Sequence, residues 1–124
     1  MTSTNLSVLR AVAERVIPAD ANGSGISGSI ALPHVLRELA VGGAMSGFQT
    51  PLSDLLTRIN DEAPGGDFTA LSAEAQDEWL YRYEQDLHTR PAFYRMVELI
   101  TEGFYTTEEG MAMVGFAPVK EVLP

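Results

Sequence analysis

Apolar residues recur along this chain at spacings of three and four positions, which is the period of one face of an α-helix. In residues 6–16 this period ends just before Pro18, and proline disfavours helical backbone at the residue that precedes it. Ser3 or Thr4 is the expected N-cap of this first helix. The apolar stripes that predict helices lie in residues 6–16, 30–39, 52–59, 79–87 and 93–104.

Glycine, proline and capping side chains separate these stripes. Residues 22–29 are rich in glycine and serine and are predicted to form a loop, while the glycine pair at residues 42–43 ends the second helix. Thr50 is expected to cap the third helix, and Ser72 is expected to cap the fourth. These signals predict helices that are all short, so each must bury its stripe against the others.

The pattern as a whole predicts an all-α domain, because no stretch shows the alternation of a strand. The length of 124 residues suits one compact domain, residues 1–124, of about five short amphipathic helices. Residues 103–124 lack a clear period and are predicted to form an irregular C-terminal tail. The core faces of the fourth and fifth helices are expected to carry Trp79, Leu80, Tyr83, Leu87, Phe93, Val97, Ile100 and Phe104.

The charge of the chain excludes several kinds of partner. It has 17 acidic and 8 basic residues, a formal net charge of −9, and would repel nucleic acid and anionic lipid. No stretch approaches the roughly 18 apolar residues of a membrane-spanning helix, so direct membrane insertion is not expected. The absence of cysteine removes thiolate catalysis and cysteine-based metal sites.

The glycine-rich loop contains two patterns that resemble ligand sites. Residues 23–28 fit the dinucleotide-binding pattern G-x-G-x-x-G, but that mechanism needs a buried strand before the glycines, and a helix ended by Pro18 precedes them here. Residues 20–24 resemble the first half of a calcium loop, but Ala31 stands where a bidentate glutamate should complete the coordination. We therefore expect an ordinary turn with no cofactor-binding or metal-binding residue.

Candidate catalytic side chains are also unconvincing. His34 and His88 are the only histidines, and neither has the histidine at i+4 or the glutamate at i+3 that would make a helical metal pair. His34 is expected on an exposed helix face, and the His88 imidazole is expected to cap carbonyls at a helix end. Adjacent carboxylates such as Asp61 and Glu62 would point about 100° apart on a helix rather than toward one substrate. The sequence thus assigns no catalytic residue.

The C-terminal stretch is the most unusual part of the sequence, because it is apolar without a period. Methionine and aromatic residues are enriched at protein interfaces, so a second chain is expected to bind here. Phe104 belongs to the stripe of the fifth helix and should act through folding. The predicted partner-interface residues are Tyr105, Met111, Met113, Val114 and Phe116.

Three segments share their pattern with one known family. Residues 9–20 end in Val-Ile-Pro-x-Asp, residues 68–80 read Phe-x-x-Leu-Ser-x-Glu-x-Gln-Asp-x-x-Leu, and residues 101–105 read Thr-Glu-Gly-Phe-Tyr. In this order they resemble the gluconate 2-dehydrogenase subunit 3 family, the small subunits of bacterial flavin-dependent sugar and polyol dehydrogenases. The chain departs from that family at residues 110–113, where Gly-Met-Ala-Met replaces the usual Gly-Gly-Asn turn, so the contact made there is expected to differ.

The resemblance implies a partner and not a reaction in this chain. Similar proteins are non-catalytic small subunits that bind and stabilise a large FAD-dependent subunit of the glucose–methanol–choline (GMC) oxidoreductase type, which oxidises a sugar or glycoside hydroxyl. FAD is then expected in the partner subunit, with no cofactor in this chain. Many such proteins begin with a twin-arginine leader, which this sequence lacks, so we expect a cytoplasmic complex, or a periplasmic one if a leader was removed.

Two other functions remain open from the residues alone. An independent acidic helical adaptor that binds an unrelated protein needs only the acidic surface and the exposed methionine and aromatic residues. A small-molecule binder would use the loop at residues 20–29.

Overall fold

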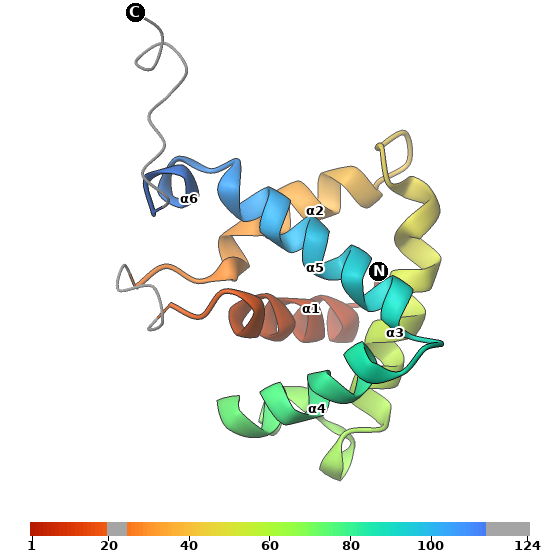
Figure 1. Cartoon of the computed structure of the whole chain (residues 1–124). Helices are drawn as coiled ribbons and strands as arrows, with labels where there is room; N and C mark the ends of the chain where they lie inside the picture. Colours follow the sequence, from red (N-terminus) through yellow and green to blue (C-terminus); the bar gives the residue numbers. More distant parts are fainter. Residues whose placement is uncertain (20–24, 114–124) are drawn as a thin grey trace, which may run out of the picture.

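The computed structural model describes residues 1–19 and 25–113, and within them every regular element is helical (Figure 1). This confirms the predicted all-α class, with six α-helices in the described ranges instead of about five. The α-helices are α1 (Ser3–Val16), α2 (Leu32–Leu39), α3 (Gln49–Asp61), α4 (Ala73–Gln85), α5 (Arg90–Tyr105) and α6 (Glu108–Met113). Four short 3-10 turns connect them: η1 (Gly28–Ala31), η2 (Ser46–Phe48), η3 (Pro64–Gly66) and η4 (Phe68–Ala70).

The helix starts follow the predicted capping chemistry with two exceptions. The Ser72 hydroxyl accepts a hydrogen bond from the Ala75 N–H at the start of α4, as predicted. At α1 the N-cap is Thr2 instead of Ser3 or Thr4, one residue earlier than expected. Thr50 does not cap α3, because η2 runs directly into that helix at Gln49 and already supplies helical backbone.

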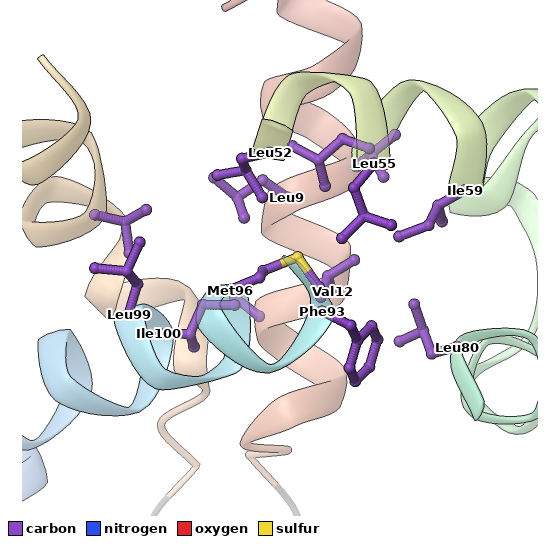
Figure 2. Close-up of a cluster of buried hydrophobic side chains, with 14 of the residues drawn as sticks. Leu9, Val12, Leu52, Leu55, Ile59, Leu80, Phe93, Met96, Leu99 and Ile100 are labelled. Atoms are coloured by element: carbon purple, nitrogen blue, oxygen red, sulfur yellow. The ribbon is translucent and has the colours of Figure 1, made fainter. Parts of the chain in front are cut away.

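The core lies where α1 meets α3, α4 and α5. Figure 2 shows Leu9 and Val12 of α1 directed toward Met96 of α5, with side chains of α3 and α4 closing the cluster. Burying such side chains contributes roughly 1.5–3 kcal/mol each before the entropy of ordering them is subtracted. The largest fully buried side chains are Phe68, Phe104, Leu9, Leu52, Leu56, Ile59, Met96 and Ile100.

Three predicted core positions differ in the structure. Trp79 is only partly buried and packs against the edge of the core. Leu87 is 74% exposed, because α4 ends at Gln85 and the Leu87 side chain no longer follows the helical face. Val97 is only partly buried, whereas Met96 and Leu99 are buried, because α5 is covered by helices on two sides and its buried stripe is broader than one row.

The first part of the predicted irregular tail is helical in the structure. Gly103 and Phe104 belong to the last turn of α5, and residues 108–113 form α6 after a turn at residues 106–107. Residues 114–124 of the predicted tail, and residues 22–24 of the predicted loop, lie outside the described residues. In the part of the chain that is described, no helix combines the length and the apolar character needed to cross a bilayer.

Candidate partner-binding surface

The junction of α5 and α6 separates a core aromatic side chain from a surface one. Phe104 is completely buried, as its place in the predicted stripe required, whereas the adjacent Tyr105 is 37% exposed. The two rings pack edge to face, with centroids 5.1 Å apart and planes at 89°. Phe104 therefore packs against Tyr105, which stays partly open to solvent.

Threonine side chains make the turn between the two helices. The Thr106 hydroxyl donates to the Gly103 carbonyl at 2.9 Å, and the Thr107 hydroxyl donates to the Phe104 carbonyl at 2.6 Å. The Thr107 oxygen in turn accepts the Gly110 N–H at 2.9 Å and caps α6. These bonds satisfy carbonyls at the end of one helix and an N–H at the start of the next, so a chain without a clear period still forms a defined corner.

Gly110 allows α6 to lie directly on the end of α5. A Cβ atom at this position would stand 1.9 Å from the Phe104 carbonyl oxygen, so no other residue fits without a backbone shift. In the sequence, Gly110 stands out only as part of the departure from the family pattern. The signal that could have found it is a lone glycine three residues after a threonine that can cap a helix.

The structure brings two of the predicted interface residues to this corner. Tyr105 is in the last turn of α5, and Met111 is partly buried in α6. Met113 is the last residue of α6, and its side chain lies outside the described part of the structure, as do Val114 and Phe116. The assignment of these five residues to an interface stays a prediction.

At Gly103, the last part of α5 crosses closely over η1 and α2. A Cβ atom at Gly103 would lie 3.0 Å from atoms of Ala31 and His34, so any other residue would require these neighbours to shift by a few tenths of an ångström. The crossing covers His34, whose Nε2 is buried without a hydrogen bond and lies 3.6 Å from a carboxylate oxygen of Glu102 and 4.0 Å from one of Glu38. The prediction that His34 is on an exposed face is wrong, because α5 packs over it.

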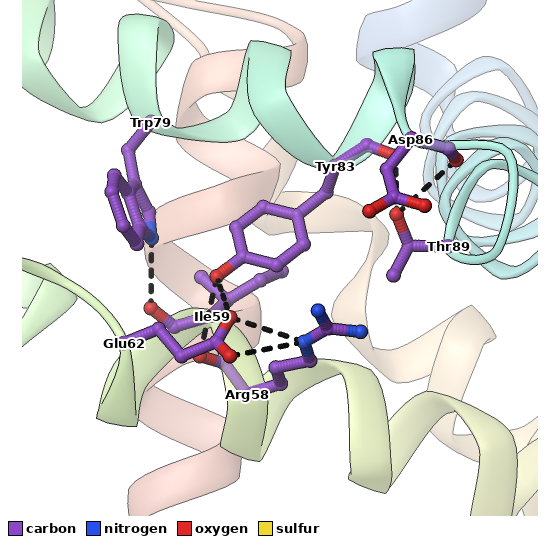
Figure 3. Close-up of polar contacts among 7 residues, drawn as sticks. All are labelled: Arg58, Ile59, Glu62, Trp79, Tyr83, Asp86 and Thr89. Atoms are coloured by element: carbon purple, nitrogen blue, oxygen red, sulfur yellow. Dashed lines mark hydrogen bonds and ion pairs between the residues drawn. The ribbon is translucent and has the colours of Figure 1, made fainter.

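A polar cluster joins α3 to α4 on a different side of the domain (Figure 3). The Tyr83 hydroxyl donates to a Glu62 carboxylate oxygen at 2.7 Å, and Arg58 Nε pairs with the same oxygen at 3.1 Å. The Trp79 indole N–H donates to the Ile59 carbonyl at 3.0 Å. A cleft of about 490 Å³ opens beside these side chains.

The pKa shifts in this cluster fit side chains that hold α3 and α4 together. Burial, reinforced by the hydrogen bond to Glu62, raises the pKa of Tyr83 well above its usual value. The same hydrogen bond is the main cause of a lowered pKa for Glu62, and Arg58 lowers it further. Tyr83 therefore stays protonated and Glu62 stays ionised near neutral pH, so neither is poised to exchange a proton there.

The remaining sequence candidates are engaged elsewhere or lie apart. Asp77 pairs with Arg15 at 2.8 Å and links α4 to α1. The capping role expected of His88 falls instead to Arg90, whose guanidinium donates to the carbonyls of Glu84 and Gln85. The calcium-like segment at residues 20–24 lies outside the described residues, and the described ranges contain no group of three or more side chains that could hold a metal ion.

The described elements define the class of the chain, an all-helical domain. Over residues 4–120 the chain matches the family model described as Gluconate 2-dehydrogenase subunit 3, and it belongs to that family, as the sequence resemblance indicated. No curated protein and no solved structure matches the chain. Membership makes the chain an accessory subunit of a hetero-oligomeric dehydrogenase complex.

Proposed function

We propose that this chain is the non-catalytic small subunit that binds and stabilises a large FAD-dependent subunit of GMC type, which oxidises a sugar or glycoside hydroxyl. The observation that carries the proposal is the family match, which spans nearly the whole described domain. The nature of the partner and its flavin follow from the resemblance of residues 9–20, 68–80 and 101–105 to the small subunits of such enzymes.

The glycine-rich segment differs in its local structure from a dinucleotide-binding loop. The glycine-rich segment follows α1 and precedes η1, so the strand that normally presents such glycines to a pyrophosphate does not precede it. The Gly28 N–H, which a phosphate-binding loop would direct at its ligand, donates instead to the Ile17 carbonyl at 2.8 Å. This bond ties the segment back to the end of α1.

The proposed contact with the large subunit includes the α5–α6 corner. Tyr105 offers a partly exposed side chain packed against Phe104, and Met111 is partly exposed on α6, the second helix of the corner. An aromatic anchor held by a packed neighbour loses little side-chain entropy on binding, which favours its use at an interface. Met113, Val114 and Phe116 are proposed to extend the same contact.

Co-expression with the large subunit tests the proposal. The large subunit carries an affinity tag, and three quantities are measured with and without the small chain: its soluble yield, its bound FAD and its sugar-oxidising activity. We expect the small chain to co-purify and to raise soluble yield and bound FAD together. A large subunit that is equally soluble, flavin-loaded and active alone, while the small chain elutes separately, contradicts the proposal.

A further inference from the structure

An open apolar groove runs between α1 and the η1–α2 segment. It has a volume of about 900 Å³, and its walls are Ser3, Leu6, Ser7 and Arg10 of α1 together with Ser29, Ile30, Leu32, Pro33 and Leu36. Leu36 is 39% exposed, and Leu6 and Ile30 are only partly buried. Three serines on the walls leave room between the larger apolar side chains.

The groove is separate from the α5–α6 corner. On α2, His34 faces Glu102 of α5, whereas Pro33 and Leu36 line the groove. Positions 34 and 36 lie about 160° apart around a helix, since each residue turns it by about 100°. The groove therefore opens on the side of α2 that α5 does not cover.

The charge of the groove differs from that of the whole chain. Acidic residues outnumber basic ones 17 to 8, yet the nine lining residues include one cation, Arg10, and no carboxylate. Within the described ranges Arg10 makes no ion pair, in contrast to Arg58 with Glu62 and Arg95 with Glu98. A complementary ligand would present apolar side chains and one acidic group beside them.

We infer that this groove receives an amphipathic segment of the large subunit, whose apolar side chains enter between α1 and α2 and whose carboxylate pairs with Arg10. The inference rests on the proposed function, because the family is one of subunits and a partner chain must cover some part of the surface of the domain. A helix laid in an apolar groove is a common way in which proteins bind a segment of a partner, and the ion pair at the rim fixes its direction.

Two groove variants test the inference without touching the core. Leu36→Glu places a charge on the apolar wall, and Ser7→Trp fills the space from an exposed position of α1. Val41→Glu is the matched control for the charge, since Val41 is fully exposed and outside the groove, and Thr4→Trp is the control for bulk on the same helix. Affinity for the tagged large subunit and the melting temperature of each isolated small chain are measured.

We expect both groove variants to bind about thirtyfold more weakly, as when an interface anchor is lost, while both controls bind like the wild type and all isolated chains melt alike. Arg10→Gln should also weaken binding, more at low salt than at high salt. If the wild type binds and the groove variants bind equally well, the groove is not the docking site, although the proposed function stands. If the wild type does not bind, both proposals fall.

Two other outcomes would assign a different occupant and overturn the inference. A large drop in melting temperature for isolated Leu36→Glu and Ser7→Trp, but not for their controls, would mean that another part of this chain fills the groove. A wild-type dimer in gel filtration that these variants convert to monomer would mean that a second copy fills it.

Discussion

Replacing Gly103 with alanine should destabilise the domain although alanine is the better helix former. The new Cβ would lie 3.0 Å from the Ala31 Cβ, the Ala31 carbonyl oxygen and the His34 Cβ, whereas carbon atoms in contact normally lie about 3.5–4.0 Å apart. Overpacking of this kind costs about 1–3 kcal/mol, and the helix propensity of alanine over glycine returns about 1 kcal/mol. The crowding wins, and we expect a net loss of about 1 kcal/mol for Gly103→Ala.

Chemical and thermal denaturation of the isolated chain measure this loss. For a domain of this size about 1 kcal/mol lowers the melting temperature by about 4 °C. Gly47→Ala is the matched control, because nothing lies within 4 Å of a Cβ built there and its φ is not positive, so it should leave the melting temperature unchanged or raise it.

A second variant shows whether crowding is the cause. In Gly103→Ala the additional change Ala31→Gly removes one of the three close contacts, so the double variant should be more stable than the sum of the single effects predicts. A Gly103→Ala chain as stable as wild type would refute the argument that α5 approaches η1 and α2 too closely for a side chain.

Three further predictions concern other parts of the molecule. Tyr83→Phe removes the hydrogen bond that chiefly lowers the pKa of Glu62. Because the pKa of Glu62 is lower in the folded state, the ionised carboxylate stabilises the fold fully above the ordinary pKa of 4.5. This stabilisation is lost as the pH falls through the lower pKa of the folded state. The free energy of unfolding should therefore fall less between pH 7 and pH 3 in Tyr83→Phe than in wild type. An equal fall in both proteins would contradict the role given to this hydrogen bond. Phe116→Ala and Met113→Ala should each weaken binding of the large subunit by about thirtyfold with unchanged circular dichroism; undiminished affinity would place the interface elsewhere, and collapsed helicity would make these residues core. His34→Gln should leave the turnover number of the complex nearly unchanged, and a hundredfold loss with intact assembly would show that a catalytic role was missed.

Local signals in the sequence determined most of the helices and their class. The period of three and four residues, the Ser72 cap and the stop at Pro18 depend on neighbours within one or two turns, so they can be interpreted without knowing the fold. For the same reason Phe104, as part of a clear stripe, was correctly predicted to be buried, and the resemblance of spaced motifs indicated the family that the chain matches.

The tertiary structure decided what depends on which helices meet. His34 is covered because α5 crosses α2 at Gly103, and no residue near His34 in sequence announces that crossing. Met96 joins the core because α5 is enclosed by helices on more than one side, which widens its buried face beyond the stripe that periodicity shows. The groove beside Arg10 exists because residues 3–10 and 29–36, about twenty positions apart, lie side by side, and contacts at that separation are set by packing and not by local propensity.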